Sequence, residues 1–177
     1  KALSKIGAAI ICATVDGTLD RHRLVCINRR PMLFIAPVVA AISEALDASR
    51  ARGVVAVLDH PRVARALASA GREVVAVSSR PRSLRRAQGR RLYGAPSALP
   101  VADEALAAVV AFGIGAMSDW FALLAEFSRT IESSGAVVLV DRGSDADLCR
   151  RALCGGLADI EQRRAGRTII TSGRIAR

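Results

Sequence analysis

Aromatic residues are scarce in this sequence: Phe, Trp and Tyr together make up 3% of its 177 residues, so the core must be built from aliphatic side chains. Long apolar runs are also lacking. The two longest, residues 6–15 and 32–42, fall well short of the ~20 residues that a membrane-spanning helix needs. We therefore expect no membrane partner and a cytoplasmic location.

Metal-binding residues are few as well. The chain has two histidines, and its four cysteines show no CxxC spacing. A structural zinc site needs such clustered ligands, so no metal site is predicted. We expect the thiols to be buried and reduced, as is usual in the cytoplasm. The cysteines are Cys12, Cys26, Cys149 and Cys154.

What the chain has in excess is arginine. The net charge is +10, and only Lys1 and Lys5 are lysines. The planar guanidinium group suits phosphate or carboxylate partners. The other explanation for an Ala- and Arg-rich chain is a GC-rich genome, so this basic composition by itself does not identify a partner.

Residues 1–53 read as an N-terminal extension. Two apolar runs within residues 6–29 flank Asp16-Gly17, a dipeptide typical of a hairpin turn. A helix is predicted from Pro37 to Gly53. A hairpin with free edges must be covered or paired, so we expect it to contact a protein partner or a second copy of the chain. Residues 14–19 also resemble the phosphatase signature of haloacid dehalogenase-like enzymes, although Thr14 stands where their nucleophile lies.

From residue 54 onward, short apolar strands alternate with helices that begin at prolines or after a capping residue. This alternation is typical of parallel βαβ units. We therefore predict a domain over residues 54–177 of the α/β class: a doubly wound, mostly parallel sheet with helices on both faces and a C-terminal antiparallel hairpin turning at Ala165-Gly166. The predicted strands are 54–58, 73–77, 107–112 and 136–140, with helices from Pro61, Pro81 and Asp119.

Four segments in this order resemble class I (Rossmann-like) S-adenosylmethionine-dependent methyltransferases. They are VVAVSSRPRSLRRA, LPVADEALAAVV, DWFALLAEFSRTIESSGAVVLVD and GLADIEQRRAGRTIITSGRI. The resemblance covers about two-thirds of the chain. In place of the family's Pro-Gly-Gly turn, the third segment has Glu132-Ser133-Ser134-Gly135.

The positions that match the family's cofactor site have lost much of its chemistry. The first strand runs through Asp59 directly into His60-Pro61, and no glycine lies between Gly53 and Gly71, whereas the family has a glycine-rich loop there. Ser78 stands where the family places the acidic residue that binds the ribose, and Ala95 where it places an acceptor for the adenine amine. A serine lacks the charge that strengthens such a hydrogen bond.

We therefore predict a non-catalytic, pseudoenzyme domain with no cofactor and no catalytic residue, in which S-adenosylmethionine binding is weak or absent. It would serve as a protein-binding scaffold or a regulatory module. Two alternatives stay open. One is an active methyltransferase that binds S-adenosylmethionine through an atypical loop. The other is a regulator that binds nucleic acid.

The second alternative depends on six arginines within twelve residues. On a helix from Pro81, three of them share one face. Such a group could bind nucleic-acid phosphates or an acidic partner, but a solvated helix face is the simpler interpretation. Only Tyr93 lies nearby as an aromatic, so a stacking surface is not predicted. The arginines are Arg80, Arg82, Arg85, Arg86, Arg90 and Arg91.

Two further features are open to a functional or a structural interpretation. His60 could act as a general base, but a helix cap before Pro61 is the simpler role. Trp120 and Phe121 could line a ligand site, but core packing at the start of a helix explains them as well.

Overall fold

A computed structural model of the chain describes residues 35–114, 117–142 and 145–176. They belong to a unit that spans Met32–Arg177. The predicted hairpin over residues 6–29 and the phosphatase-like signature at 14–19 lie outside the described residues. Contact with a partner through that hairpin therefore stays a prediction.

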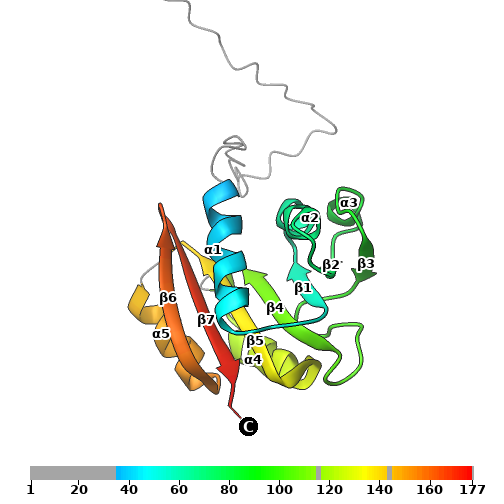
Figure 1. Cartoon of the computed structure of the whole chain (residues 1–177). Coiled ribbons are helices and arrows are strands. Elements are labelled where there is room, and N and C mark those ends of the chain that lie inside the picture. The colour runs from blue at the N-terminus through cyan, green and yellow to red at the C-terminus, as the bar shows by residue number, and fades with distance from the viewer. Residues whose placement is uncertain (1–34, 115–116, 143–144, 177) are drawn as a thin grey trace, which may run out of the picture. The chain divides into compact units, whose positions relative to one another are not determined.

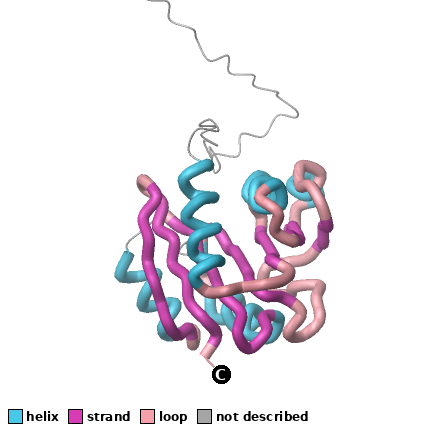
Figure 2. The backbone as a smooth tube through the Cα atoms, viewed as in Figure 1, coloured by secondary structure: helices cyan, strands magenta, loops and turns pink. Residues whose placement is uncertain are grey.

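The unit is built on a seven-stranded sheet in the order β3-β2-β1-β4-β5-β7-β6 (Figures 1 and 2). Strand β7 runs antiparallel to both neighbours, β5 and β6, and the other pairings are parallel. The predicted doubly wound sheet with a C-terminal antiparallel hairpin is thus confirmed. The strands are β1 Val55–Leu58, β2 Val74–Ser78, β3 Arg90–Tyr93, β4 Leu106–Phe112, β5 Ile131–Asp141, β6 Leu157–Ala165 and β7 Thr168–Ile175.

Helices cover both faces of this sheet. One face packs against α1 (Ile35–Ala48), α2 (Pro61–Ser69) and α3 (Pro81–Leu84), and the other against α4 (Trp120–Thr130) and α5 (Asp145–Cys154). Every residue of β1 and β2 is buried, which explains why these strands are continuous apolar runs rather than alternating ones. The core is almost wholly aliphatic, with Phe127 its largest fully buried side chain.

Several elements differ from the prediction. Helix α1 begins at Ile35 and ends at Ala48, five residues before Gly53, and α3 is a single turn. Strand β3 was not predicted, because two of its four residues are arginines and it therefore lacks the run of apolar residues that indicates a strand. The segment expected as a turn at 132–135 is a bulge within β5: Leu106 pairs with Ile131, but Ala108 pairs with Ala136.

The bulge in β5 requires a glycine at position 135. A Cβ atom there would lie 2.3 Å from Ile131 Cγ2 and 2.6 Å from the Ala107 carbonyl oxygen. We expect Gly135→Ala to lower the free energy of unfolding by about 2 kcal/mol, the usual cost of overpacking, as measured by urea denaturation. Ser134→Ala is the control, since it changes an exposed position of the same bulge. Equal, small losses in both variants would show that the bulge tolerates a side chain.

The domain boundary after Gly53 stays a prediction. Helix α1 lies before it, yet Ile42, Ala45 and Leu46 are buried in the same core as β1 and α2.

The expectation of buried thiols is wrong for Cys154, which is exposed, and Cys149 is half-buried. No helix in the described ranges is long and apolar enough to cross a membrane.

Candidate functional site

The order in which successive strands are added to the sheet reverses between β1 and β4. The chain adds β2 and β3 on one side of β1, then returns to place β4 on the other side. In open α/β sheets, ligands bind outside the carboxyl ends of the strands at such a switch point. The residues that end β1, β2 and β4 are therefore the first candidates for a site. They are Ser78 at the end of β2, Asp59 and His60 directly after β1, and Phe112 and Gly113 at the end of β4.

Asp59 makes the turn from β1 into α2. Its φ is 52°, a left-handed conformation that Asp tolerates better than most residues. Its N–H donates to the Val77 carbonyl oxygen at 2.9 Å, which ties the turn to β2. The side chain is exposed, and its Oδ1 accepts a 2.5 Å hydrogen bond from Ser78 Oγ. The site thus presents an exposed, oriented carboxylate.

Ser78 is the buried partner of this carboxylate. Its side chain is 2% exposed, and Oγ accepts a 3.0 Å hydrogen bond from the Arg80 N–H while it donates to Asp59. The hydroxyl is therefore fully used within the protein. A ligand would meet the Asp59 carboxylate rather than the serine itself.

His60 is the N-cap of α2, as the simpler interpretation predicted. Its Nδ1 accepts a hydrogen bond from the Val63 N–H, and Pro61 follows at the first helical position. The ring stacks on Phe112 with a 4.4 Å centroid separation, which links the ends of β1 and β4. Burial lowers the pKa of His60 below its usual 6.5, and the charge of Arg62 acts in the same direction. Because its Nδ1 is occupied, His60 is poorly placed to act as a general base.

The lowered pKa of His60 predicts a pH-dependent stability. Since the unfolded chain takes up a proton on His60 more readily, the stability should be complete above pH 6.5 and decline as the pH falls through the folded pKa. We expect His60→Asn, which keeps a capping side chain, to lose less stability between pH 7 and pH 5 than the native chain. Urea denaturation across this range measures the difference. Parallel curves for both proteins would contradict the prediction.

The third position of the predicted cofactor site, Ala95, offers no polar side chain. It is exposed and forms an isolated bridge with Ala98, closed by a hydrogen bond from the Ala98 N–H to the Ala95 carbonyl oxygen at 3.0 Å. Asp59 and Ser78 are brought together, and Ala95 follows Gly94, whose N–H donates to the Ser78 carbonyl oxygen at 3.2 Å. Only Asp59 among the three fits a ligand with paired hydroxyl groups, such as a ribose.

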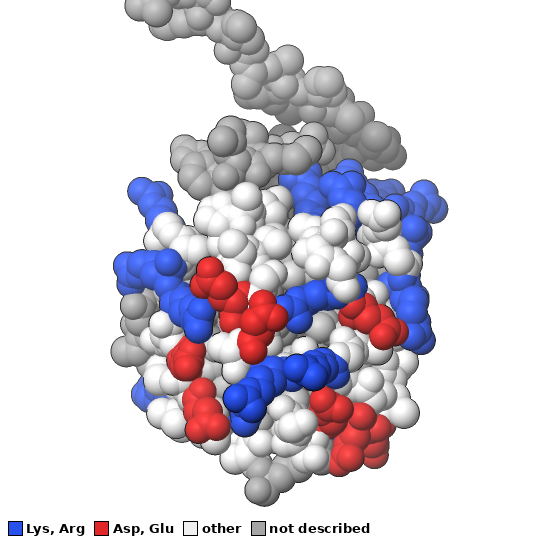
Figure 3. All heavy atoms as spheres, viewed as in Figure 1, with Lys and Arg blue, Asp and Glu red and all other residues white. Residues whose placement is uncertain are grey.

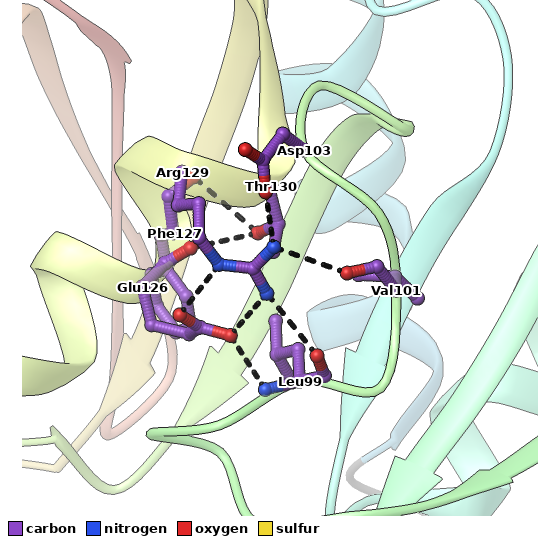
Figure 4. A network of polar contacts seen from close by, with 7 residues as sticks. All are labelled: Leu99, Val101, Asp103, Glu126, Phe127, Arg129 and Thr130. Carbon is purple, nitrogen blue, oxygen red and sulfur yellow. Dashed lines mark hydrogen bonds and ion pairs between the residues drawn. The ribbon is translucent and has the colours of Figure 1, made fainter.

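The connection between β3 and β4 is held by a polar network that sequence reasoning missed (Figure 4). Arg129 on α4 donates to the carbonyl oxygens of Leu99 and Val101, both at 3.2 Å, and also binds Asp103. Glu126 receives two hydrogen bonds from Arg129 and one from the Leu99 N–H. The hydrogen bonds from Arg129 are the main reason that the pKa of Glu126 is lowered. The spacing of Glu126 and Arg129, three residues apart on a helix, is the signal that could have found the pair.

The predicted aromatic pair at the start of α4 is only partly in the core. Trp120 packs against the buried face of the sheet, but Phe121 is 58% exposed, so core packing is wrong for Phe121. Their rings stack at 3.8 Å, and the Arg151 guanidinium lies 5.8 Å from the Trp120 ring centre. Asp119 makes no side-chain capping bond. No group of acidic, histidine and cysteine side chains that could hold a metal lies among the described residues.

The predicted arginines all lie on exposed positions around α3 and β3, next to the end of β2. Arg80 caps α3 and is joined to the Asp59–Ser78 pair through its N–H. The six arginines thus gather at one edge of the sheet beside the candidate site, with Arg90 and Arg91 on opposite faces of β3.

A scan of protein-family models and a search of curated proteins both find no match to this sequence. Solved structures do match. The chain is similar to one from the complex of the Haloferax volcanii Trm112 methyltransferase activator with its candidate methyltransferase, at 14% identity and a TM-score of 0.66, over 77% of this chain and 88% of that one. It is equally similar to the Burkholderia thailandensis 1,6-didemethyltoxoflavin-N1-methyltransferase, at 14% identity and a TM-score of 0.66, over 80% and 79% of the two chains.

A third similar structure is the TehB-like S-adenosylmethionine-dependent methyltransferase from Corynebacterium glutamicum, at 17% identity and a TM-score of 0.56, over 77% of this chain and 95% of that one. These neighbours define the class: the fold is that of class I, Rossmann-like, S-adenosylmethionine-dependent methyltransferases. The chain described here is a methyltransferase-like domain.

The same comparison corrects the expectation that the domain has no cofactor. The Corynebacterium neighbour is an S-adenosylmethionine-dependent methyltransferase, and the Burkholderia protein holds S-adenosylhomocysteine together with 1,6-didemethyltoxoflavin. The expectation counted Ser78 as a lost carboxylate. It did not anticipate that Asp59 would lie 2.5 Å from the serine hydroxyl.

Proposed function

We propose that this methyltransferase-like domain binds S-adenosylmethionine at the carboxyl ends of β1 and β2, and that it serves as a binding or regulatory module. The observation that carries the proposal is the exposed Asp59 carboxylate, oriented by Ser78 at the switch point of the sheet. A carboxylate there can accept hydrogen bonds from both ribose hydroxyls, which are stronger than bonds to a neutral acceptor. S-adenosylmethionine would supply a methyl group and a sulfonium charge.

The way in which the chain leaves β1 supports a role in binding rather than methyl transfer. It passes from Asp59 through His60 into α2, with Pro61 at the first helical position. Proline has no N–H, and the Val63 N–H is already bonded to His60. Ligand recognition at this turn would therefore depend on one side chain more than on a loop of backbone N–H groups. A module that senses the ligand needs affinity but not the near-attack geometry that transfer requires.

An active methyltransferase is the second candidate. Its support is the complete strand order around the switch point, together with the open space at Gly113, where a Cβ atom would meet nothing within 4 Å. In that case an acceptor would approach the end of β4.

A protein partner is part of the proposal. One structural neighbour comes from a complex with a methyltransferase activator, which supports protein association for a domain of this fold. We propose that residues 6–29 provide the contact, with either a different protein or a second copy of this chain.

Calorimetric titration of the full chain with S-adenosylmethionine, S-adenosylhomocysteine and methionine tests the proposal. We expect saturable binding of the two adenosyl compounds and none of methionine. If no saturable heat appears up to roughly 1 mM ligand, where binding is worth only about 4 kcal/mol, the proposal is wrong. A transfer assay with methyl-labelled cofactor and cell extract as acceptor separates the two candidates, because label in an acceptor would favour the enzyme.

A further inference from the structure

The positive charge of this protein is concentrated in one stretch of the chain. Residues 60–94 hold nine arginines, one glutamate, and no lysine or aspartate. Their net charge is therefore +8, out of +10 for the whole chain. These residues include α2, α3, β2 and β3, at one end of the sheet order. In the space-filling view, arginine side chains gather over α2 and α3, whereas both signs mix over the rest of this face (Figure 3).

The six arginines around α3 and β3 form what we call the arginine edge. All are exposed, and β3 is an outer strand of the sheet, paired only with β2 among the described strands. Nothing in the described unit therefore covers this edge. The arginine edge consists of Arg80, Arg82, Arg85, Arg86, Arg90 and Arg91.

Few carboxylates neutralise the arginine edge. Among the described residues, its one ion pair joins Arg90 to Glu73 at 3.6 Å, with both side chains more than half exposed. The other arginines with ion pairs have closer partners: Arg72 binds Asp47 at 2.6 Å, and Arg163 binds Glu44 at 3.1 Å. Like charges held together raise the energy of the free protein, and a polyanion would relieve this repulsion.

Tyr93 extends the arginine edge toward the candidate site. In the parallel register, Arg91 pairs with Ala76 and Tyr93 with Ser78. Side chains at paired positions share a face of the sheet, so these two β3 residues lie on the face that α3 covers. Tyr93 is 66% exposed. An exposed aromatic ring thus lies beside the strand end that holds the Asp59–Ser78 pair.

We propose that the arginine edge binds the phosphodiester backbone of a single-stranded nucleic acid, with Tyr93 stacking on a base beside Asp59 and Ser78. A group of exposed arginines attracts the phosphates of a nucleic-acid backbone, and one exposed aromatic ring suits a base. A protein interface would need an apolar centre. Of the exposed large apolar residues, only Tyr93 lies on this edge, while Met117, Phe121 and Leu153 belong to other elements.

Fluorescence anisotropy with a labelled single strand of about 20 nucleotides tests this proposal. We expect binding by the full chain that weakens steeply from about 50 to 200 mM salt. Arg85→Ala/Arg86→Ala should weaken binding roughly tenfold and reduce the slope of log affinity against log salt by roughly 1.4, for two lost phosphate contacts. Tyr93→Ala should weaken binding of the single strand more than that of a duplex.

The matched control is Arg142→Ala/Arg167→Ala, which removes the same charge from the end of β5 and from the β6–β7 turn. It should bind nearly as well as the native chain. Equal losses in both double variants, or no binding by the native chain, would overturn the proposal. So would equally tight binding of polyglutamate that is lost in Arg85→Ala/Arg86→Ala, since the edge would then suit an acidic protein.

This inference can fail independently of the proposed function. Arg85→Ala/Arg86→Ala should leave S-adenosylmethionine binding unchanged in calorimetry, because neither side chain contacts Asp59 or Ser78. Asp59→Asn should in turn not weaken nucleic-acid binding, because it removes a carboxylate rather than a cation.

Discussion

Replacing Asp59 with Asn should weaken S-adenosylmethionine binding about 10- to 100-fold. The substitution keeps the size of the side chain, and Asn tolerates the φ of 52° at this turn. What it removes is the charge that strengthens hydrogen bonds from ribose hydroxyls. Bonds to charged groups contribute roughly 1.5–3 kcal/mol, and each 1.4 kcal/mol corresponds to a factor of about ten in affinity. Calorimetry on the native and variant chains measures the change.

Asp159 provides a matched control for this experiment. It is also exposed, with a φ of 51°, but lies in β6 at the opposite edge of the sheet. Asp159→Asn should leave affinity unchanged. Ser78→Ala should cause a smaller loss than Asp59→Asn, since the carboxylate remains but loses the hydrogen bond that orients it. If Asp59→Asn binds the ligand as tightly as the native chain, the ribose contact proposed here does not exist.

The sequence predicted most of the fold because the central strands are buried on both faces. Residues 54–58 and 107–112 read as apolar runs, and Pro61 and Pro81 mark the helices between the strands. Burial on both faces imposes such a pattern, whatever the function. Strand β3 escaped prediction because an outer strand has no such requirement. Arg90 and Arg91 are exposed there and break the apolar signal.

The candidate site was less predictable because it depends on neighbours that are distant in sequence. Asp59 and Ser78 are 19 residues apart, and only the parallel pairing of β1 and β2 brings their oxygens together. Judged one position at a time, Ser78 looks like a lost carboxylate and the chain like a domain without a cofactor. In the function proposed above, Asp59 supplies this charge from the end of the adjacent strand.

Breaking the Glu126–Arg129 pair should destabilise the fold more than breaking the exposed Glu44–Arg163 pair. Glu126→Ala is expected to lower the free energy of unfolding by about 2–3 kcal/mol, because it leaves the Leu99 N–H without its acceptor and removes two hydrogen bonds from the Arg129 guanidinium. The Glu126 side chain is only 13% exposed, so water replaces it poorly. Urea denaturation measures the loss. Glu44→Ala, which breaks the exposed pair with Arg163, is the control, with an expected loss of about 0–1 kcal/mol.

The pH dependence of the stability lost on substituting Glu126 shows whether the charge of its carboxylate or the packing of its side chain is responsible. Hydrogen bonds from Arg129 lower the pKa of Glu126 below its usual 4.5. The stability that the charged pair contributes should be complete above pH 4.5 and lost as the pH falls through the folded pKa. Glu126→Gln should therefore be less stable than the native chain at pH 7 and approach it at low pH. A constant difference would mean that shape, rather than charge, holds residues 99–103 against α4.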